Sequence, residues 1–151
     1  MRVVIQRVSG CFVSIKGEVI SNIGNGLLVL AGFENDDTEE DLIWMSKKIS
    51  GLRVFNDENG IMNLSLKDIN GEMMIVSQFT LHAKTKKGNR PSYIKAAKPD
   101  TAIPLYEKFI KICESETGKE VKTGKFGTDM QISLINDGPV TVIIDSKNKD
   151  L

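Results

Sequence analysis

The chain has 151 residues, 40% of them hydrophobic and 26% charged, which fits one domain with its own core and excludes a disordered, collagen-like or coiled-coil protein. Its 20 basic and 20 acidic residues give a formal net charge of zero, which excludes a general nucleic-acid coat. No apolar run approaches the ~20 residues that span a bilayer, and Met1–Val8 lacks the apolar core of a signal peptide. We therefore expect a soluble, cytoplasmic, single-domain protein over residues 1–151, with no membrane partner and with 147–151 as a loose tail.

The first part of the chain is predicted to form strands. Val3–Val8 and Phe12–Ile15 read as strands, and Lys16-Gly17 turns the chain into a hairpin partner at Glu18–Ile20. A glycine-containing turn then leads into Leu27–Ala31, whose continuous apolar run is typical of a strand covered on both faces.

An acidic segment, Glu34–Asp41, carries six acids in eight residues and precedes a helical pattern. Asp37 and Glu40 have the spacing of a capping box, and negative charge stabilises a helix N-terminus. The acids are therefore interpreted as helix capping and a solvated face rather than as metal ligands. The buried face of this helix is predicted to contain Leu42, Met45, Ile49 and Leu52.

The middle of the chain predicts another interior strand, a basic loop and a second helix. Met73–Phe79 is the strand, and it ends in polar residues. Lys84–Lys98 follows as a loop with six basic residues and no acid. The second helix begins near Asp100 or Thr101, tolerates Pro104 in its first turn and closes at Gly118. Its buried stripe is predicted to contain Leu105, Phe109, Ile112 and Cys113.

The last part of the chain reads as two strands with a break between them. Met130–Ile135 alternates, Asn136–Pro139 interrupts the pattern, and Val140–Ile144 resumes it. Many strands and two helices predict an α/β fold with a single domain. We expect mixed, mostly antiparallel and barrel-like β-sheets with two main helices packed on one face, in α/β/β layers.

Three residues are candidates for thiol or imidazole chemistry. Cys11 and Cys113 lie far apart and form no CxxC pair, so we expect free core thiols. The single histidine, His82, is interpreted as a surface residue at a strand end. A zinc site would need all three residues and a carboxylate to converge, so we predict no metal.

Two segments could carry chemistry in a chain that lacks the GxSxG, P-loop, GxGxxG and HExxH motifs. Ser77–Leu81 places hydroxyl and amide groups at the end of a buried strand, where sheet proteins commonly build sites. Strand termination with local backbone hydrogen bonds explains it equally well. Asn136–Thr141 needs no purpose beyond a tight turn.

Taken together, these segments resemble a known family. MRVVIQRVS at the start, MNLSL (Met62–Leu66), SQFTL (Ser77–Leu81), KKGNRPS (Lys86–Ser92) and TGKFGTDMQISLINDGPVT (Thr123–Thr141) are similar to D-aminoacyl-tRNA deacylases. The resemblance runs from Met1 to about Asp145, and both the SQxT and NxGPxT motifs are intact.

The resemblance implies a homodimeric hydrolase without a cofactor. It would cleave the ester that joins a D-amino acid, or glycine mischarged on tRNA(Ala), to the 3′-terminal adenosine of tRNA. Ser77, Gln78, Phe79 and Thr80 would line the catalytic pocket. The backbone N–H of Phe79 is the candidate oxyanion donor. Thr80 is ranked as a positioning residue before a nucleophile, with help from the 2′-hydroxyl of the tRNA.

The second motif implies a site shared between subunits. Gly138 and Pro139, joined by a cis peptide in the family, would enter the pocket of the neighbouring subunit and exclude L-amino acids. Arg7 and Asn136 would support that dipeptide.

Contacts with the tRNA acceptor stem are expected from the basic loop through Lys84, Lys86, Lys87 and Arg90. A solvated loop is the alternative. Phe126 either stacks near the terminal adenine or belongs to the core.

Two other functions remain open. One is a nucleic-acid-binding module on the same fold without catalysis. The other is an acyltransferase that carries an acyl group on Thr80.

Overall fold

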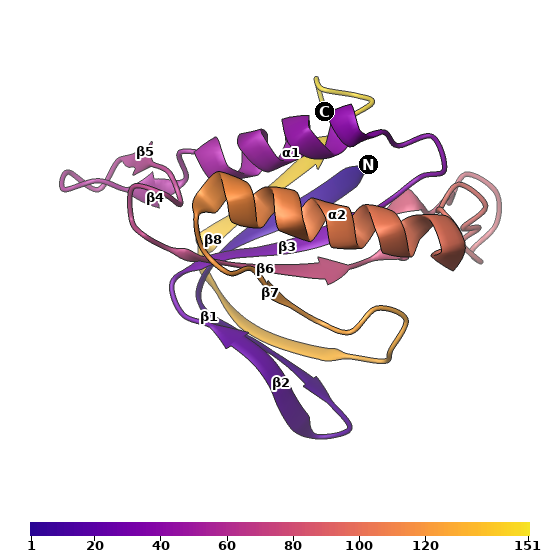
Figure 1. The fold of residues 1–151 in the computed structure, drawn as a ribbon, viewed down its shortest axis with the longest axis horizontal. Helices are drawn as coiled ribbons and strands as arrows, with labels where there is room; N and C mark the ends of the chain where they lie inside the picture. Colours follow the sequence, from indigo (N-terminus) through magenta and orange to yellow (C-terminus); the bar gives the residue numbers. More distant parts are fainter.

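The computed structural model describes all residues from Met1 to Leu151. Two helices lie on one side of a bent, mostly antiparallel sheet, and a small two-stranded arm projects at one end (Figure 1). In chain order the elements are β1 (Arg2–Ile15), β2 (Glu18–Ile23), β3 (Gly26–Gly32), α1 (Glu39–Gly51), β4 (Phe55–Asn56), β5 (Met62–Leu64), β6 (Glu72–Ser77), the 3₁₀-helix η1 (Phe79–His82), α2 (Pro99–Thr117), β7 (Lys122–Thr123) and β8 (Gln131–Asp145).

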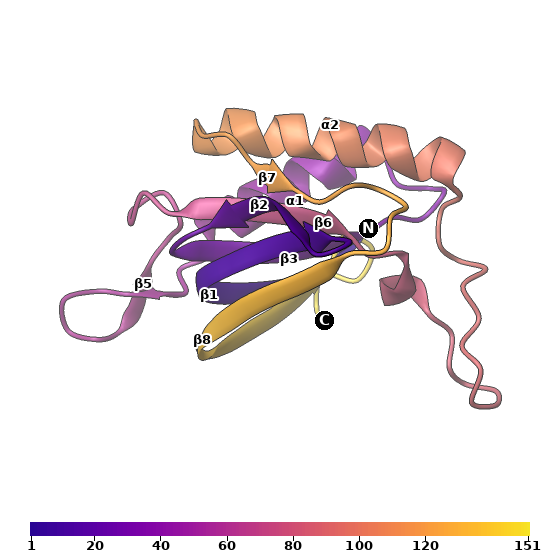
Figure 2. The same cartoon turned by 90° about the horizontal axis from the view of Figure 1, so that it is seen from below.

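The long strand β1 organises the main sheet. Its first half pairs with β3 and its second half with β2, while β8 runs antiparallel along both halves. β6 and β7 extend the sheet beyond β3 in parallel, which gives the order β2-β1-β3-β6-β7. The predicted mixed, mostly antiparallel sheet is confirmed. The strand ends fold toward one another, so that the sheet is nearly barrel-shaped (Figure 2).

The predicted hairpin turn is confirmed, and two predicted strand breaks are wrong. Lys16 and Gly17 both have positive φ, at 49° and 82°, as the tightest hairpin turns require. β1 runs without interruption through Val8–Phe12, and β8 runs through Asn136–Pro139. The register between β1 and β8 shifts on either side of Val8, and these bulges allow both strands to continue.

Both faces of the central strands are covered, as their continuous apolar runs predict. One face of β3 and β6, with Leu27, Val29 and Ile75, packs under the two helices. The other face, with Leu28 and Met74, belongs to a second cluster inside the curved sheet. These two cores produce the expected α/β/β layering.

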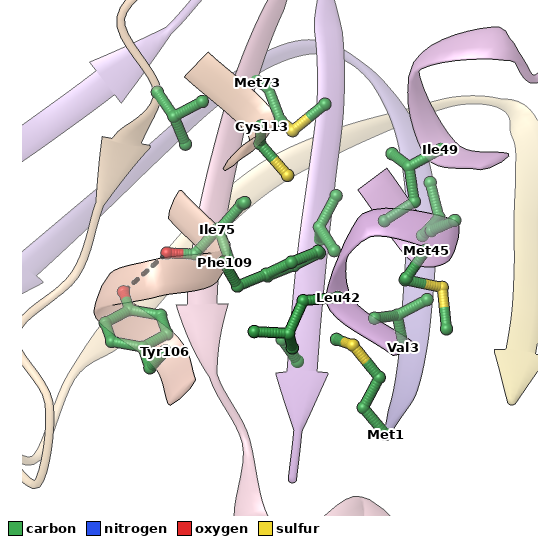
Figure 3. Packing of buried hydrophobic residues seen from close by; sticks show 14 of the residues in the cluster. Met1, Val3, Leu42, Met45, Ile49, Met73, Ile75, Tyr106, Phe109 and Cys113 are labelled. Atoms are coloured by element: carbon green, nitrogen blue, oxygen red, sulfur yellow. Dashed lines mark hydrogen bonds between the residues drawn. The ribbon is translucent and has the colours of Figure 1, made fainter. Parts of the chain in front are cut away.

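The helices pack on the sheet through apolar side chains, and one buried hydrogen bond joins α2 to β6 (Figure 3). Leu42, Met45 and Ile49 of α1 are fully buried, as predicted, whereas Leu52 ends the helix and is half-buried. In α2 the buried residues are Ala102, Tyr106, Phe109 and Cys113. Phe109 and Cys113 were predicted, whereas the predicted Leu105 and Ile112 are only half-buried. The Tyr106 hydroxyl donates to the Ile75 carbonyl at 2.8 Å.

The start of α1 differs from the prediction. Thr38 is the N-cap, and the Asp41 carboxylate accepts from the Thr38 N–H at 2.8 Å, so the capping box is shifted by one residue. Asp37 lies before the helix, where it accepts from the Met1 amino group and from the Glu34 N–H. The tertiary partners of Asp37 therefore decide at which residue α1 begins. α2 begins at Pro99, slightly earlier than expected, and closes as predicted at Gly118 with a φ of 70°.

Candidate active site at the ends of strands β3 and β6

A pocket of about 610 Å³ opens where β3 and β6 end. The first turn of α2 closes one side of it, and the loop that precedes β8 closes another. Its lining combines the two strand ends, the start of η1, the segment before α2 and the loop before β8: Ala31, Gly32, Phe33, Val76, Ser77, Gln78, Phe79, Tyr93, Ala96, Ala97, Lys98, Pro99, Ala102, Phe126, Gly127, Thr128, Asp129, Met130 and Ile132.

The SQFT segment reaches this pocket because β6 stops there. The Gln78 N–H still bonds the Ala31 carbonyl at 2.7 Å, which extends the ladder by one residue before the chain turns into η1. Ser77, Gln78 and Phe79 line the pocket. Thr80 lies just beyond the lining, and its hydroxyl oxygen accepts a hydrogen bond from the Gln78 side-chain amide at 2.6 Å.

Two residues that the sequence interpretation did not select hold η1 in place. A Cβ on Gly32 would lie 2.8 Å from the Gln78 carbonyl oxygen, so only glycine allows this close packing. The Arg2 guanidinium donates to the Leu81 carbonyl and to Asp145, each at 2.9 Å. Burial opposes ionisation of Asp145, but hydrogen bonds from the Lys147 N–H and from Arg2 outweigh it and hold the pKa of Asp145 below its usual value.

Aromatic rings flank the pocket on two sides. The Phe79 ring is 56% exposed and packs edge-to-face on Tyr93, with ring centroids 5.1 Å apart. Phe126 lines the pocket and also packs on the core, 5.7 Å from the Tyr106 ring. Phe126 therefore borders both the core and the pocket, and its stacking near the terminal adenine stays a prediction.

His82 is not the surface residue that we expected. It is only 3% exposed, its Nδ1 lies 3.6 Å from a Glu34 carboxylate oxygen, and its Nε2 has no hydrogen-bond partner. The residue packs against Gly32 and does not line the pocket. A hydroxyl-imidazole-carboxylate set is therefore not assembled here.

Both cysteines are free and buried, as expected, and lie outside the pocket. Burial raises the pKa of Cys11 to about 11 and that of Cys113 to about 12, so neither is a thiolate at neutral pH. No group of three or more acidic, histidine or cysteine side chains is arranged to hold a metal ion. None of the helices is long and apolar enough to cross a bilayer.

The second motif forms an exposed bend in β8 at the other end of the sheet. The Gly138-Pro139 peptide is cis, and both residues are exposed. Arg7 is 8% exposed, and its guanidinium donates to the Asp137 carbonyl at 2.9 Å and to the Val54 carbonyl at 2.6 Å. The Asn136 side chain accepts from the Val140 N–H at 2.9 Å and donates to the Thr141 hydroxyl at 3.0 Å, which braces the bend.

The two motifs are therefore separated within one chain. Thr141 pairs with Gln6, whereas Ser77 pairs with Ala31, which in turn pairs with Val3. Figure 2 shows the bend of β8 at the end of the sheet away from the segment that follows β6. The structure brings together Ser77, Gln78, Phe79 and Thr80, and separately Arg7, Asn136, Gly138 and Pro139.

The basic loop extends outward beside the pocket. Lys84 and Ser92 form an isolated antiparallel bridge, and the loop tip between them carries Lys86, Lys87 and Arg90. These four cations are exposed and take part in no ion pair within the chain. Their charge is free to meet an anion from outside.

Comparison with known proteins identifies the family of this chain. A family model described as D-Tyr-tRNA(Tyr) deacylase matches residues 4–145. A Flavobacterium psychrophilum protein named D-aminoacyl-tRNA deacylase is 62% identical over 150 residues, which is 99% of this chain and 100% of that protein. A Parabacteroides distasonis protein of the same name is 60% identical over the same shares.

Solved structures share the fold. One titled "c-Myc DNA Unwinding Element Binding Protein" has a TM-score of 0.90 at 40% identity and covers 96% of this chain and 98% of its own. Another, titled as a probable eukaryotic D-amino acid tRNA deacylase, has a TM-score of 0.82 at 18% identity and covers 95% and 97%. The resemblance read from the sequence is confirmed: this chain belongs to the D-Tyr-tRNA(Tyr) deacylase family.

Proposed function

We propose that this protein hydrolyses the ester bond of D-aminoacyl-tRNA and releases the D-amino acid and free tRNA. The observation that carries the proposal is the pocket built around Ser77, Gln78 and Phe79 in a chain of this family. Its volume, about 610 Å³, lies within the usual range for a small-molecule site and suits one aminoacyl-adenosine end.

The active unit in this proposal is a homodimer in which Gly138 and Pro139 of one subunit enter the pocket of the other. Support comes from the separation of the two motifs within one chain and from the exposure of the dipeptide. A two-fold dimer would place each bend against the partner's pocket and would create two equivalent sites.

Rate acceleration would rest on backbone hydrogen-bond donors. Phe79 begins η1, and the first N–H groups of a helix have no acceptor inside it. The Phe79 N–H is thus suited to stabilise the oxyanion that develops when water attacks the ester, and one such donor contributes ~10²–10³ in rate. An aminoacyl ester is already activated, so the absence of a base beside Thr80 is consistent with this chemistry.

Thr80 would position the substrate rather than attack it. The Gln78 amide donates to its hydroxyl oxygen, which occupies one of the two lone pairs and makes the oxygen less nucleophilic. The substrate's own 2′-hydroxyl would assist the attacking water in its place.

Chirality would be read by main-chain atoms. Carbonyl oxygens of the partner's dipeptide would accept from the substrate ammonium and fix its direction. The side chain of an L-amino acid would then clash with the dipeptide, whereas glycine, which has no side chain, would be accepted. Discrimination of this kind is indifferent to the identity of the D-side chain.

The unpaired cations Lys84, Lys86, Lys87 and Arg90 would hold phosphates of the acceptor stem. Binding through phosphates tolerates sequence changes and weakens as salt increases.

The hydrolysis proposal is tested by incubating the purified protein with D-Tyr-tRNA and with L-Tyr-tRNA and measuring the amino acid released. We expect selective loss of the D-ester, and glycyl-tRNA(Ala) should be cleaved as well. Equal rates on both enantiomers, or no release above the buffer control, would refute the proposal.

Subunit mixing tests the shared site. Gly32→Leu displaces η1 and the pocket edge, and Gly138→Ala disturbs the bend, so each homodimer should be inactive on D-Tyr-tRNA. A heterodimer of the two variants retains one intact pocket facing one intact bend, so a mixture should recover about a quarter of parental activity if chains pair at random. Heterodimers that form, as shown by mass spectrometry, yet stay inactive would exclude a cross-subunit site.

A second candidate is a nucleic-acid-binding module without catalysis. The relative titled as a DNA unwinding element binding protein, at 40% identity, favours it. Tight tRNA binding without ester hydrolysis would decide for this candidate. The acyltransferase alternative requires an acyl group on Thr80, which intact-protein mass spectrometry would detect.

A further inference from the structure

We propose that Trp44 and the cations around it form a second binding surface for the phosphate backbone of tRNA, separate from the pocket and from the basic loop. This inference rests on the proposed function for its substrate. The surface, called here the Trp44 patch, comprises Trp44, Lys47, Lys48, Gly51, Arg53 and Lys149.

The patch forms because α1 buries the opposite side. Leu42, Met45 and Ile49 point into the core, so Lys47 and Lys48 lie on the exposed face, one turn after Trp44. Trp44 itself is half-buried and packs against the edge of the core. Between them and Arg53 lies a hollow of about 410 Å³, open at Gly51, where a Cβ would meet no atom within 4 Å.

The residues after β8 complete the patch. Lys147 donates to Asp41 at 2.8 Å, and the C-terminal residues lie over the first turns of α1 (Figure 1). This brings the Lys149 ammonium to 4.7 Å from the centre of the Trp44 ring, while the Lys48 ammonium lies at 5.6 Å. Two cations therefore converge on one indole.

Most of the charge of the patch is not neutralised within the chain; only Arg53 is engaged, since its Nε donates to the Asn63 carbonyl at 3.0 Å and its charge acts on the Asp68 carboxylate. Lys47, Lys48, Arg53 and Lys149 take part in no ion pair. Three cations that line the hollow (Lys47, Lys48 and Arg53), together with Lys149 at the Trp44 ring, produce a local positive potential in a protein of zero net charge. A phosphate backbone is complementary to this potential.

The position of the patch indicates which tRNA it would contact. Arg53 precedes Val54, whose carbonyl accepts from Arg7, and Arg7 also holds Asp137 next to the exposed Gly138. The first turn of α1, at the other end of the helix, carries three acids; Glu40, which takes part in no ion pair, would repel RNA leaving the chain's own pocket. A tRNA whose 3′ end occupies the partner's pocket would therefore meet this patch.

Trp44 is the single tryptophan of the chain, so its fluorescence reports on the patch directly. The test titrates the full-length protein with non-acylated tRNA, which requires no catalysis, and measures Trp44 emission and its quenching by acrylamide. Bound tRNA should change the emission and protect the indole from acrylamide. No change at concentrations that saturate binding, measured independently by filter retention, would overturn the proposal.

Gly51 offers a matched pair of variants. Gly51→Glu places a carboxylate in the hollow and should weaken tRNA binding about fivefold or more at low salt, whereas Gly51→Ala makes the same backbone change without charge and should bind as the parent does. Lys47→Gln should lower the slope of log affinity against log salt by about 1. Asn22→Asp, on exposed β2, controls for adding a negative charge elsewhere.

The outcomes separate this inference from the proposed function. Loss of affinity in Gly51→Glu but not in Gly51→Ala or Asn22→Asp supports the patch, even if D-Tyr-tRNA is not hydrolysed. If D-Tyr-tRNA is hydrolysed and all three variants bind tRNA with equal affinity, the patch proposal is refuted and the proposed function is retained. A DNA duplex of the same length that binds as tightly as tRNA would overturn the assignment to tRNA.

Discussion

The Arg7 guanidinium joins two segments that are far apart in the sequence, because it donates to the Asp137 carbonyl at 2.9 Å and to the Val54 carbonyl at 2.6 Å. One buried side chain thereby fixes both the bend that presents Gly138 and Pro139 and the segment that leads to the β4–β5 arm. These two carbonyls and the Asp137 carboxylate, at 3.6 Å, are the partners of the buried Arg7 guanidinium.

Replacing Arg7 should therefore affect stability and selectivity together. In Arg7→Ala two carbonyls lose a charged donor, and we expect a loss of about 2–3 kcal/mol in the free energy of unfolding. The D-to-L ratio of hydrolysis should fall as well, because the bend loses its support. Urea denaturation and paired assays on D- and L-Tyr-tRNA measure the two effects. Arg7→Lys, which keeps the charge but not the fork of donors, should be intermediate; a variant that is destabilised but fully selective would separate Arg7 from chirality.

Gly32 should matter for activity although it contributes no side chain. In Gly32→Ala the new methyl group would meet the Gln78 carbonyl oxygen at 2.8 Å, so η1 and the pocket edge must move. Misplacement by ~1 Å costs on the order of 10²-fold in rate, and we expect kcat/KM to fall toward that amount. Gly10→Ala is the matched control, since a Cβ there meets nothing within 4 Å. Equal activity in the two variants would mean that the position of η1 is unimportant.

Local signals in the sequence predicted most of the fold. Lys16-Gly17 specified its turn, and the apolar runs of β3 and β6 specified burial on both faces. Both features could be predicted because a turn and a buried strand depend on residues that are adjacent in the sequence. The capping box shifted to Thr38 because Asp37 is engaged by the Met1 amino group, which no local pattern reveals. The same holds for the site: SQFT was found at a strand end, but the roles of Gly32 and Arg2 depend on contacts across the sheet. His82 was misplaced because a short 3₁₀-helix turns it inward.

Alkaline pH should destabilise the protein through Tyr106. Burial raises the pKa of Tyr106 to about 12, whereas an unfolded tyrosine titrates near ~10. Between these values the unfolded chain binds fewer protons than the folded one, so the free energy of unfolding falls as pH rises. Tyr106→Phe should reduce this decline above pH ~10. Below that pH it should cost about 1–2 kcal/mol, because the buried Ile75 carbonyl loses its donor. Tyr93→Phe, at an exposed ring, should change neither the free energy of unfolding nor its decline at high pH. Chemical denaturation from pH 8 to 11 measures both the free energy and its decline.

Thr80 distinguishes a water-based mechanism from a covalent one. If Thr80 only positions the substrate, Thr80→Val removes the acceptor for the Gln78 amide and should lower kcat by about tenfold while activity persists, because one side-chain hydrogen bond is worth ~1 kcal/mol or slightly more. Thr80→Ser keeps the hydroxyl and should stay close to the parent. If Thr80 carries the acyl group, Thr80→Val should have no activity above background, and rapid quenching of the parent with D-Tyr-tRNA should trap an ester on residue 80. Because the Gln78 amide directs a proton toward the Thr80 oxygen, and no base contacts its hydroxyl, we expect no trapped ester and a residual rate in Thr80→Val.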